Sequence, residues 1–250
     1  MGNPQKDWHI QTMKAMILAA GRGKRMRPLT DHTPKPLLKI AGKPLIVWHI
    51  ENLKQAGFQD IVINIAWLGD QIPKALGDGS QFGVNLIYSD EQNEPNKGAL
   101  ETAGGIIKAL PLLGDKPFLV VNGDVWCDYH YSNQNPLKGN DQAHLILVNN
   151  PDHNPKGDFA LFNNRVDVEF KSKDQDQSKL TFSGIGYYHP ELFKDLPEQK
   201  LALAPILRKA MHNNQVSGEM FSGEWHDIGT PERLKALDLS HQINSGTNSP

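Results

Sequence analysis

The chain has 250 residues, of which 38% are hydrophobic, and a formal net charge of −2 at pH 7. The near-neutral charge gives no basis for nucleic-acid binding, no apolar run approaches membrane-spanning length, and the single cysteine, Cys127, excludes a disulfide within the chain. This cysteine usage indicates a cytoplasmic protein, in which Cys127 is a buried small hydrophobe and not a nucleophile.

A composition of this kind is enough for one compact core, so we expect a single domain over residues 13–243. Residues 1–12 are polar and lack the charged-then-apolar layout of a signal peptide, so we expect them to be a disordered N-terminal extension. Residues 244–250 are expected to form a frayed polar tail.

A short apolar run at 16–20 has strand length and breaks at Gly21 and Gly23. A buried strand that feeds a glycine turn gathers bare backbone N–H groups, which bind anions. Basic side chains interleave with the glycines and follow them: Arg22, Lys24, Arg25, Arg27 and, after a proline, Lys35. The turn therefore predicts a polyphosphate site.

Two common phosphate loops do not match this turn. A Rossmann dinucleotide loop needs a third glycine where Met26 stands, which disfavours an NAD-dependent oxidoreductase. A Walker loop needs Ser or Thr after Gly-Lys, and Arg25 follows Lys24.

Strands and helices alternate in the following segments. We expect helices at 44–56 and 70–76, and a third helix that opens with residues 102–104 and runs to 110. We expect strands at 61–66, 84–88, 118–124 and 143–149. This order predicts a Rossmann-like α/β fold, with a mainly parallel sheet and helices on both faces. Strands at 165–170 and 180–188 alternate apolar and polar residues, which favours a small antiparallel lobe, and further helices are expected at 190–196, 201–212 and 232–242.

The apolar strand at 118–121 continues into Asn-Gly-Asp, which places Asp124 at its carboxyl end. Ligands of open α/β sheets bind at that edge, and Mg²⁺ takes one or two carboxylates together with phosphate oxygens. An ordinary strand ending is the alternative, so the metal role of Asp124 depends on the glycine turn. Asp128 is a less favoured second candidate.

Residues 18–39 resemble the signature of the sugar-1-phosphate nucleotidylyltransferases, Leu-Ala-Ala-Gly-x-Gly-x-Arg-Met-x-Pro-Leu-Thr followed by Pro-Lys. A second matching segment is Trp-His-Asp-Ile-Gly-Thr-Pro at 225–231. The resemblance implies that the nucleoside triphosphate contacts Ala20, Gly21, Gly23, Arg25, Thr102 and Gly104. It further implies Arg25, Lys35 and Asp124 as catalytic residues, and Mg²⁺ bound by Asp124 and Asp227.

The sugar side of the site is read from three further places. Lys156 and Asp158 lie in a turn-rich segment that is equally well interpreted as a hairpin loop, and Gly184 stands where the family places a glycine against an N-acetyl group, with a bulge as the alternative. Leu-Glu-Thr-Ala-Gly-Gly, in which Glu101 replaces the commoner glycine, resembles family members whose sugar is N-acetylmuramic acid.

The resemblance therefore implies a uridylyltransferase that joins UTP to N-acetylmuramic acid 1-phosphate in cell-wall sugar recycling. Mannose-1-phosphate guanylyltransferase, glucose-1-phosphate thymidylyltransferase and a non-catalytic nucleotide-sugar-binding regulator remain alternatives. Retention of the loop cations and both aspartates favours an enzyme. Its expected partners are these small molecules, with no nucleic acid and no membrane, and its expected state is a monomer or small homo-oligomer.

Overall fold

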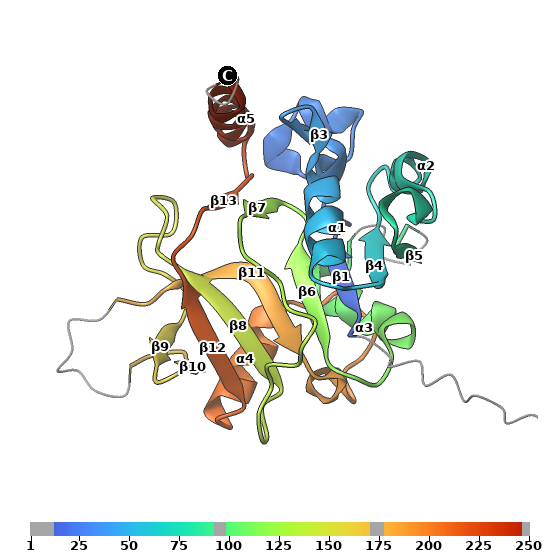
Figure 1. Ribbon diagram of the computed structural model, residues 1–250. Helices are drawn as coiled ribbons and strands as arrows, with labels where there is room; N and C mark the ends of the chain where they lie inside the picture. Colours follow the sequence, from blue (N-terminus) through green and yellow to red (C-terminus); the bar gives the residue numbers. More distant parts are fainter. Residues whose placement is uncertain (1–12, 93–98, 171–177, 247–250) are drawn as a thin grey trace, which may run out of the picture.

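The computed structural model describes residues 13–92, 99–170 and 178–246 (Figure 1). The predicted N-terminal extension lies outside these ranges. Among the described residues, no helix combines the length and the apolar character that a membrane span requires.

One nine-stranded sheet forms the centre of the molecule (Figure 1). Its order is β5 (Asn85–Asp90), β4 (Asp60–Ile65), β1 (Ala15–Leu18), β6 (Phe118–Asn122), β11 (Thr181–Tyr188), β8 (Ala143–Val148), β12 (Val216–Phe221), β10 (Arg165–Asp167) and β9 (Ala160–Phe162). The first four strands run parallel, as predicted. β11 is antiparallel to both of its neighbours, and β8 and β12 are parallel.

The antiparallel strands that we expected in a small lobe belong to this same sheet. β11 pairs with β6 on one side and with β8 on the other, while β9 and β10 form a hairpin at the far edge. The sheet is continuous because Ile185 pairs with Val121 of β6, which lets both halves share one core. β12 escaped prediction, since its glycine and polar residues give no apolar run.

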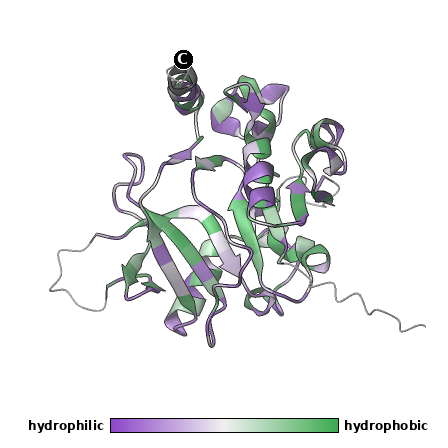
Figure 2. Ribbon diagram, viewed as in Figure 1, coloured by the Kyte–Doolittle hydropathy of each residue, from purple (hydrophilic) through white to green (hydrophobic). Residues whose placement is uncertain are grey.

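Helices cover both faces, because successive residues of each central strand point to opposite sides. Ala15 and Ile17 of β1 pack with α1 (Leu45–Gln55), whereas Met16 packs with α3 (Glu101–Leu113). α4 (Leu203–His212) covers the antiparallel half on the same side as α3. The central strands β1 and β6 are accordingly largely apolar (Figure 2).

A third apolar cluster joins three separate parts of the chain at one end of the sheet. It contains Met26 from the glycine-turn segment, Trp126 of β7 (Val125–Cys127), Ile228, and Leu237 of α5 (Pro231–Gly246). β13 (Trp225–Asp227) pairs with β7, and β2 (Lys39–Ile40) pairs with β3 (Lys43–Pro44). This cluster fixes the glycine turn beside the Asp227 segment.

The remaining elements differ from prediction mainly at their ends. α2 (Gln71–Leu76) lies where it was expected, and α5 extends past its predicted end at residue 242. The helix expected at 190–196 is a short 3₁₀ turn, Pro190–Phe193. This segment is too short for a stable α-helix on its own.

Candidate active site

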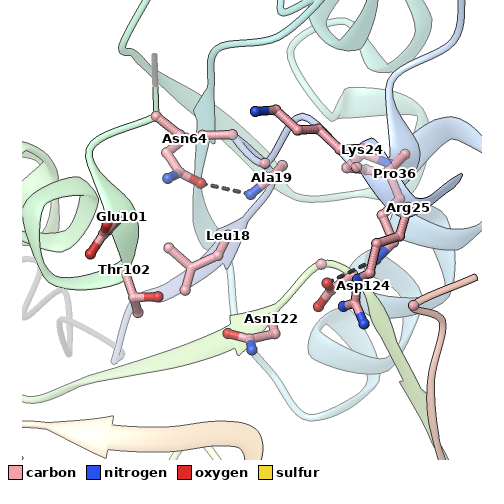
Figure 3. Close-up of a pocket in the computed structure, with 17 residues that line it drawn as sticks. Leu18, Ala19, Lys24, Arg25, Pro36, Asn64, Glu101, Thr102, Asn122 and Asp124 are labelled. Carbon is pink, nitrogen blue, oxygen red and sulfur yellow. Dashed lines mark hydrogen bonds and ion pairs between the residues drawn. The ribbon is translucent and has the colours of Figure 1, made fainter. Parts of the chain in front are cut away.

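A cavity of about 360 Å³ opens where β1 and β6 end (Figure 3). Leu18 and Asn122, the last residues of these strands, are register partners, so both strands finish at the same edge of the sheet. The cavity is lined by most of the residues that the sequence assigned to the nucleotide and to catalysis: Ala20, Gly21, Gly23, Arg25, Lys35, Thr102 and Asp124. Ligands of open α/β sheets bind at such an edge.

The two glycines of the turn serve different purposes. Gly23 has φ +62°, and a Cβ there would lie 3.1 Å from Thr30 Cγ2, so this position needs glycine for its backbone and for its packing. The Thr30 hydroxyl donates a hydrogen bond to the Gly23 carbonyl at 2.8 Å and closes the turn. At Gly21 a Cβ would meet no atom within 4 Å, so this position leaves room in the cavity itself.

The basic residues of the turn divide into two sets. Lys24 and Arg25 line the cavity. Arg22 instead stacks on the ring of Trp67 at 4.3 Å, and Arg27 forms an ion pair of 2.7 Å with an aspartate four residues later. Only part of the positive charge predicted for this turn therefore faces the cavity.

Asp124 and Lys35 form an ion pair at one wall of the cavity. Lys35 Nζ lies 2.9 Å from Asp124 Oδ2. The Lys35 side chain is only 8% exposed, whereas that of Asp124 is 45% exposed. Burial fixes the Lys35 ammonium in place beside the more exposed Asp124 carboxylate. This wall therefore holds a positive charge that a phosphate in the cavity can approach.

Asp227 comes from the far end of the chain and lies beside this wall, although it does not itself line the cavity. It pairs with Val125 in the β7–β13 sheet, and the Ile228 N–H donates to the Asp124 carbonyl at 2.9 Å. A Cβ at Gly229 would lie 3.2 Å from Asp227 Oδ2 and 3.3 Å from Arg25 Nη2. The structure therefore brings Asp124, Asp227 and Arg25 together, as the sequence predicted.

Two further side chains that the sequence did not single out contact Asp227. Arg233 Nη1, in the first turn of α5, lies 2.8 Å from Asp227 Oδ2, and His153 Nε2 lies 3.1 Å from the same oxygen. Arg233 looks like an ordinary helix residue in the sequence, and His153 lies in a loop of unremarkable composition. Only the tertiary fold brings them to this carboxylate.

The two aspartates suit a hard divalent cation that also binds phosphate. Within the described ranges, no group of three or more His, Cys, Asp and Glu side chains gathers as a metal site. Mg²⁺ does not need such a group, since it is usually held by one or two carboxylates together with substrate phosphates and water. Asp124 and Asp227 supply that number of carboxylates.

A second cavity of about 460 Å³ adjoins the first. Both are lined by Glu101, Thr102 and Asn122, and the second continues between β11, α4 and the loop before β9. Its further polar lining comes from Asp158 and Arg208. Arg208 was not predicted as a site residue, because a cation in the last turns of a helix is favourable whatever its function.

Of the predicted sugar-side residues, only Asp158 lines this second cavity, and Gly184 lies at the register shift between Phe182 and Ile185 of β11. The Asp158 carboxylate accepts hydrogen bonds from the Phe182 N–H at 2.8 Å and from Asn154 Nδ2 at 3.1 Å, so it also fastens its loop to β11. Gly184 has φ +83°, and a Cβ there would lie 2.6 Å from Asn122 Nδ2. Lys156 is exposed and does not line the cavity.

Gly104 also lies outside the cavity lining, although it was assigned to the nucleotide. A Cβ at this position would lie 2.2 Å from the Gln199 carbonyl oxygen, so the glycine permits close packing of α3 against the segment before α4. Cys127 is buried, as expected, and burial raises the pKa of its thiol. A protonated buried thiol is a poor nucleophile.

Residues 14–242 match the family model of the nucleotidyl transferases. The chain belongs to the sugar-1-phosphate nucleotidylyltransferase family. It is 57% identical over 228 residues to the N-acetylmuramate alpha-1-phosphate uridylyltransferase of Neisseria meningitidis, an alignment that covers 89% of this chain and 96% of that one. It is 31% identical to the enzyme of the same name from Caulobacter vibrioides, over 90% of this chain and 95% of the relative.

A solved structure supports the same placement in this nucleotidylyltransferase family. A putative glucose-1-phosphate thymidylyltransferase from Bacillus anthracis superposes with a TM-score of 0.76 at 25% identity, covering 91% of this chain and 94% of that chain. The mainly parallel α/β fold predicted from the sequence is therefore confirmed.

Proposed function

We propose that this enzyme condenses UTP with N-acetylmuramic acid 1-phosphate to give UDP-N-acetylmuramic acid and pyrophosphate. The observation that carries the proposal is the 57% identity with a uridylyltransferase of this specificity across nearly the full length of both chains. The cavity agrees with it, because the cationic glycine turn and Asp124 line one cavity, Asp227 pairs with the residue after Asp124, and a second cavity of sugar-accommodating size adjoins the first. The reaction would return a cell-wall sugar to its nucleotide-activated form.

The nucleotide would lie along the first cavity. The open space at Gly21, together with Lys24 and Arg25, suits the triphosphate, since bare amides and fixed positive charge both favour anions. Thr102, on the opposite wall at the start of α3, suits the nucleobase. Figure 3 shows Arg25 and Asp124 on one side of the cavity and Glu101 and Thr102 on the other.

The chemistry requires two anions to react with each other. An oxygen of the sugar phosphate attacks the α-phosphorus of UTP, the bond to the bridging oxygen breaks, and pyrophosphate leaves with that electron pair. The sugar phosphate is already an anion at neutral pH, so no general base is needed, and alignment and charge neutralisation supply the catalysis. Lys35 and Arg25, which line the same cavity as Asp124, would offset negative charge.

Asp124 and Asp227 would hold Mg²⁺ in this enzyme. The bound ion supplies positive charge to phosphate oxygens, which is the usual role of a divalent cation in phosphoryl and nucleotidyl transfer. The chain's own contribution is to keep the two carboxylates adjacent through the β7–β13 pairing and the Ile228–Asp124 backbone hydrogen bond.

The sugar would occupy the second cavity, which begins where the nucleotide site ends. On the family resemblance we place the N-acetyl group near Gly184, which is itself buried and packs closely against Asn122, a residue that lines both cavities. Asp158 lines the cavity, and Lys156 would act from its rim. Because both substrates are cytoplasmic metabolites, we propose a cytoplasmic location for the enzyme. We further propose that it works as a monomer or small homo-oligomer and has no nucleic-acid or membrane partner.

Gly21→Ala is expected to raise the KM for UTP about tenfold or more while leaving the melting temperature near that of the wild type. The added methyl meets no protein atom but occupies space assigned to the triphosphate. Gly23→Ala is the contrasting variant and should lower the melting temperature, because its backbone has a positive φ. An unchanged KM for UTP in Gly21→Ala would contradict the placement of the triphosphate.

A matrix of substrates tests the proposed specificity. UTP, CTP, GTP and dTTP are each combined with the 1-phosphates of N-acetylmuramic acid, N-acetylglucosamine, glucose and mannose, and pyrophosphate release is measured with Mg²⁺. We expect the highest kcat/KM for UTP with N-acetylmuramic acid 1-phosphate. A preference for GTP with mannose 1-phosphate or dTTP with glucose 1-phosphate would support the alternative transferases, and no release from any pair would indicate a binding protein.

A further inference from the structure

Glu91 is a carboxylate in the protein interior that takes no part in the site described above. It follows β5 directly and its side chain is fully buried, at 0% exposure. Its Oε1 accepts a hydrogen bond from Asn64 Nδ2 at 2.8 Å, and its Oε2 accepts one from the Leu100 N–H at 2.8 Å. Burying a carboxylate is costly unless such hydrogen bonds replace its water, so both partners matter.

Asn64 extends this arrangement to the glycine turn. It lies near the end of β4, is 3% exposed, and its Oδ1 accepts a hydrogen bond from the Ala19 N–H at 2.7 Å (Figure 3). Because Oδ1 serves Ala19 and Nδ2 serves Glu91, the amide has one orientation that satisfies both. A continuous chain of hydrogen bonds thus runs from Ala19, at the entry to the turn, to Leu100, at the start of α3.

The two ends of this chain belong to opposite walls of the nucleotide cavity. Ala19 and Gly21 lie on one wall, and Glu101 and Thr102, which follow Leu100, lie on the other. Ala19 and Asn64 are part of the cavity lining, yet they and Glu91 are buried, so the hydrogen bonds between the two ends are shielded from solvent. Their geometry is therefore suited to set the separation of the two walls.

A glycine in α3 leaves space for the buried pair. A Cβ at Gly105 would lie 2.8 Å from Asn64 Nδ2 and 2.8 Å from Glu91 Oε1. Glycine within a helix is unfavourable relative to alanine, so its presence here is explained by the close approach of these two side chains. Gly105 thus has a reason to be glycine that is independent of its neighbour Gly104.

The backbone at the start of α3 needs such a restraint. Glu101 has φ +60°, a backbone conformation that residues other than glycine rarely adopt. Strained backbone persists where its surroundings fix it, and the hydrogen bond from the Leu100 N–H to Glu91 lies directly beside this residue. Leu201 adds a second restraint, since its N–H donates to the Leu100 carbonyl at 2.9 Å.

We infer that the Asn64–Glu91 pair is a positioning unit for the nucleotide, which keeps the glycine turn and the start of α3 at the separation that one nucleoside triphosphate requires. The inference rests on the proposed function, in which the triphosphate and the base contact these two walls. Glu91 acts through Asn64 and Leu100 and does not touch the substrate. A shift between the walls weakens nucleotide binding far more than sugar-phosphate binding, because Ala19 and Gly21 belong to the first cavity alone and most of the second cavity is lined by other elements.

Two variants test the pair in different ways. Glu91→Gln keeps the size of the side chain but has only one acceptor oxygen. Either Asn64 Nδ2 or the Leu100 N–H therefore loses the oxygen to which it donates. Gly105→Ala retains every polar group and pushes a methyl against the pair. Both are expected to raise the KM for UTP at least tenfold in pyrophosphate-release assays, with the KM for N-acetylmuramic acid 1-phosphate within twofold of the wild type. Calorimetric titration with UTP alone should show the same loss of affinity.

Leu53→Ala is the control for general loss of stability. Leu53 is a fully buried residue near the end of α1, just before β4 begins and therefore at the opposite edge of the sheet from the cavity. This variant should lower the melting temperature and leave both KM values within twofold. A drop in melting temperature without a selective rise in the KM for UTP, in both test variants, would overturn the inference.

The test separates this inference from the proposed function. If the wild type turns over another triphosphate faster than UTP, the proposed function is contradicted, and that triphosphate becomes the probe for the pair. If Glu91→Gln does not fold, Gly105→Ala decides alone, because it leaves the carboxylate and the amide in place. Equal rises in the KM for UTP and the KM for N-acetylmuramic acid 1-phosphate would overturn the inference, because they would show that the pair has a purely structural role.

Discussion

Asp124→Asn is expected to lower kcat for pyrophosphate release by at least about 10²-fold, the scale of losing one group that stabilises charge in a transition state. The carboxylate is half-exposed in the cavity and adjacent to Asp227, so its charge is available to a divalent cation. The neutral amide still offers an oxygen to Lys35 and keeps the fold intact. Steady-state kinetics at saturating substrates, with melting temperature as a check, measure this effect.

Asp128→Asn is the matched control for this prediction. Asp128 directly follows β7, and its Oδ1 accepts a hydrogen bond from the Glu224 N–H at 2.7 Å, which an asparagine oxygen can also do. The cavity lining does not include it. We expect kcat of Asp128→Asn within about threefold of the wild type. Wild-type turnover by Asp124→Asn would show that the assigned carboxylate is wrong.

Lys35→Ala is expected to lower kcat by about 10²- to 10³-fold. Its ammonium is buried beside Asp124, so the positive charge is held in place without being screened by water. Removing it leaves the Asp124 carboxylate without its ion-pair partner, and the negative charge of the attacking phosphate without a nearby positive charge to offset it. The loss should fall mainly on kcat, because the charge is needed most when the two anions approach each other.

Lys39→Ala removes an exposed lysine from the same segment and serves as the control. It should leave kcat within twofold of the wild type, since its side chain does not line the cavity. If Lys35→Ala and Lys39→Ala show the same small effect, general surface charge explains the results and the specific role of Lys35 is lost.

Local sequence was sufficient to find the residues that end strands or sit in distinctive turns. Gly21, Lys35 and Asp124 each stand next to a strand or a proline that marks their place, and the structure puts all three in one cavity. The meeting of Asp124 with Asp227 was predicted as well. In the structure the antiparallel pairing of β13 with β7, which is a separate two-stranded sheet, brings them together.

Residues that act through tertiary contacts gave no such signal. Arg233 and His153 reach Asp227 only because α5 and the loop before β9 fold back to it. Glu91 stands in an acidic, polar stretch of the sequence, where nothing distinguishes a buried carboxylate from a solvated one. Asn64 lies within a strand that its apolar residues were sufficient to predict. Nothing in the sequence indicated that this polar residue has a role in the site.

Anomalous diffraction from crystals of the enzyme with Mn²⁺ and UDP-N-acetylmuramic acid tests the central claim most directly. The account predicts a manganese peak within coordination distance of both Asp124 and Asp227, the uridine against Thr102 and the sugar in the cavity lined by Asp158. A peak away from either aspartate, or a diphosphate bound outside the cavity formed by the Gly21 turn and Asp124, would contradict it.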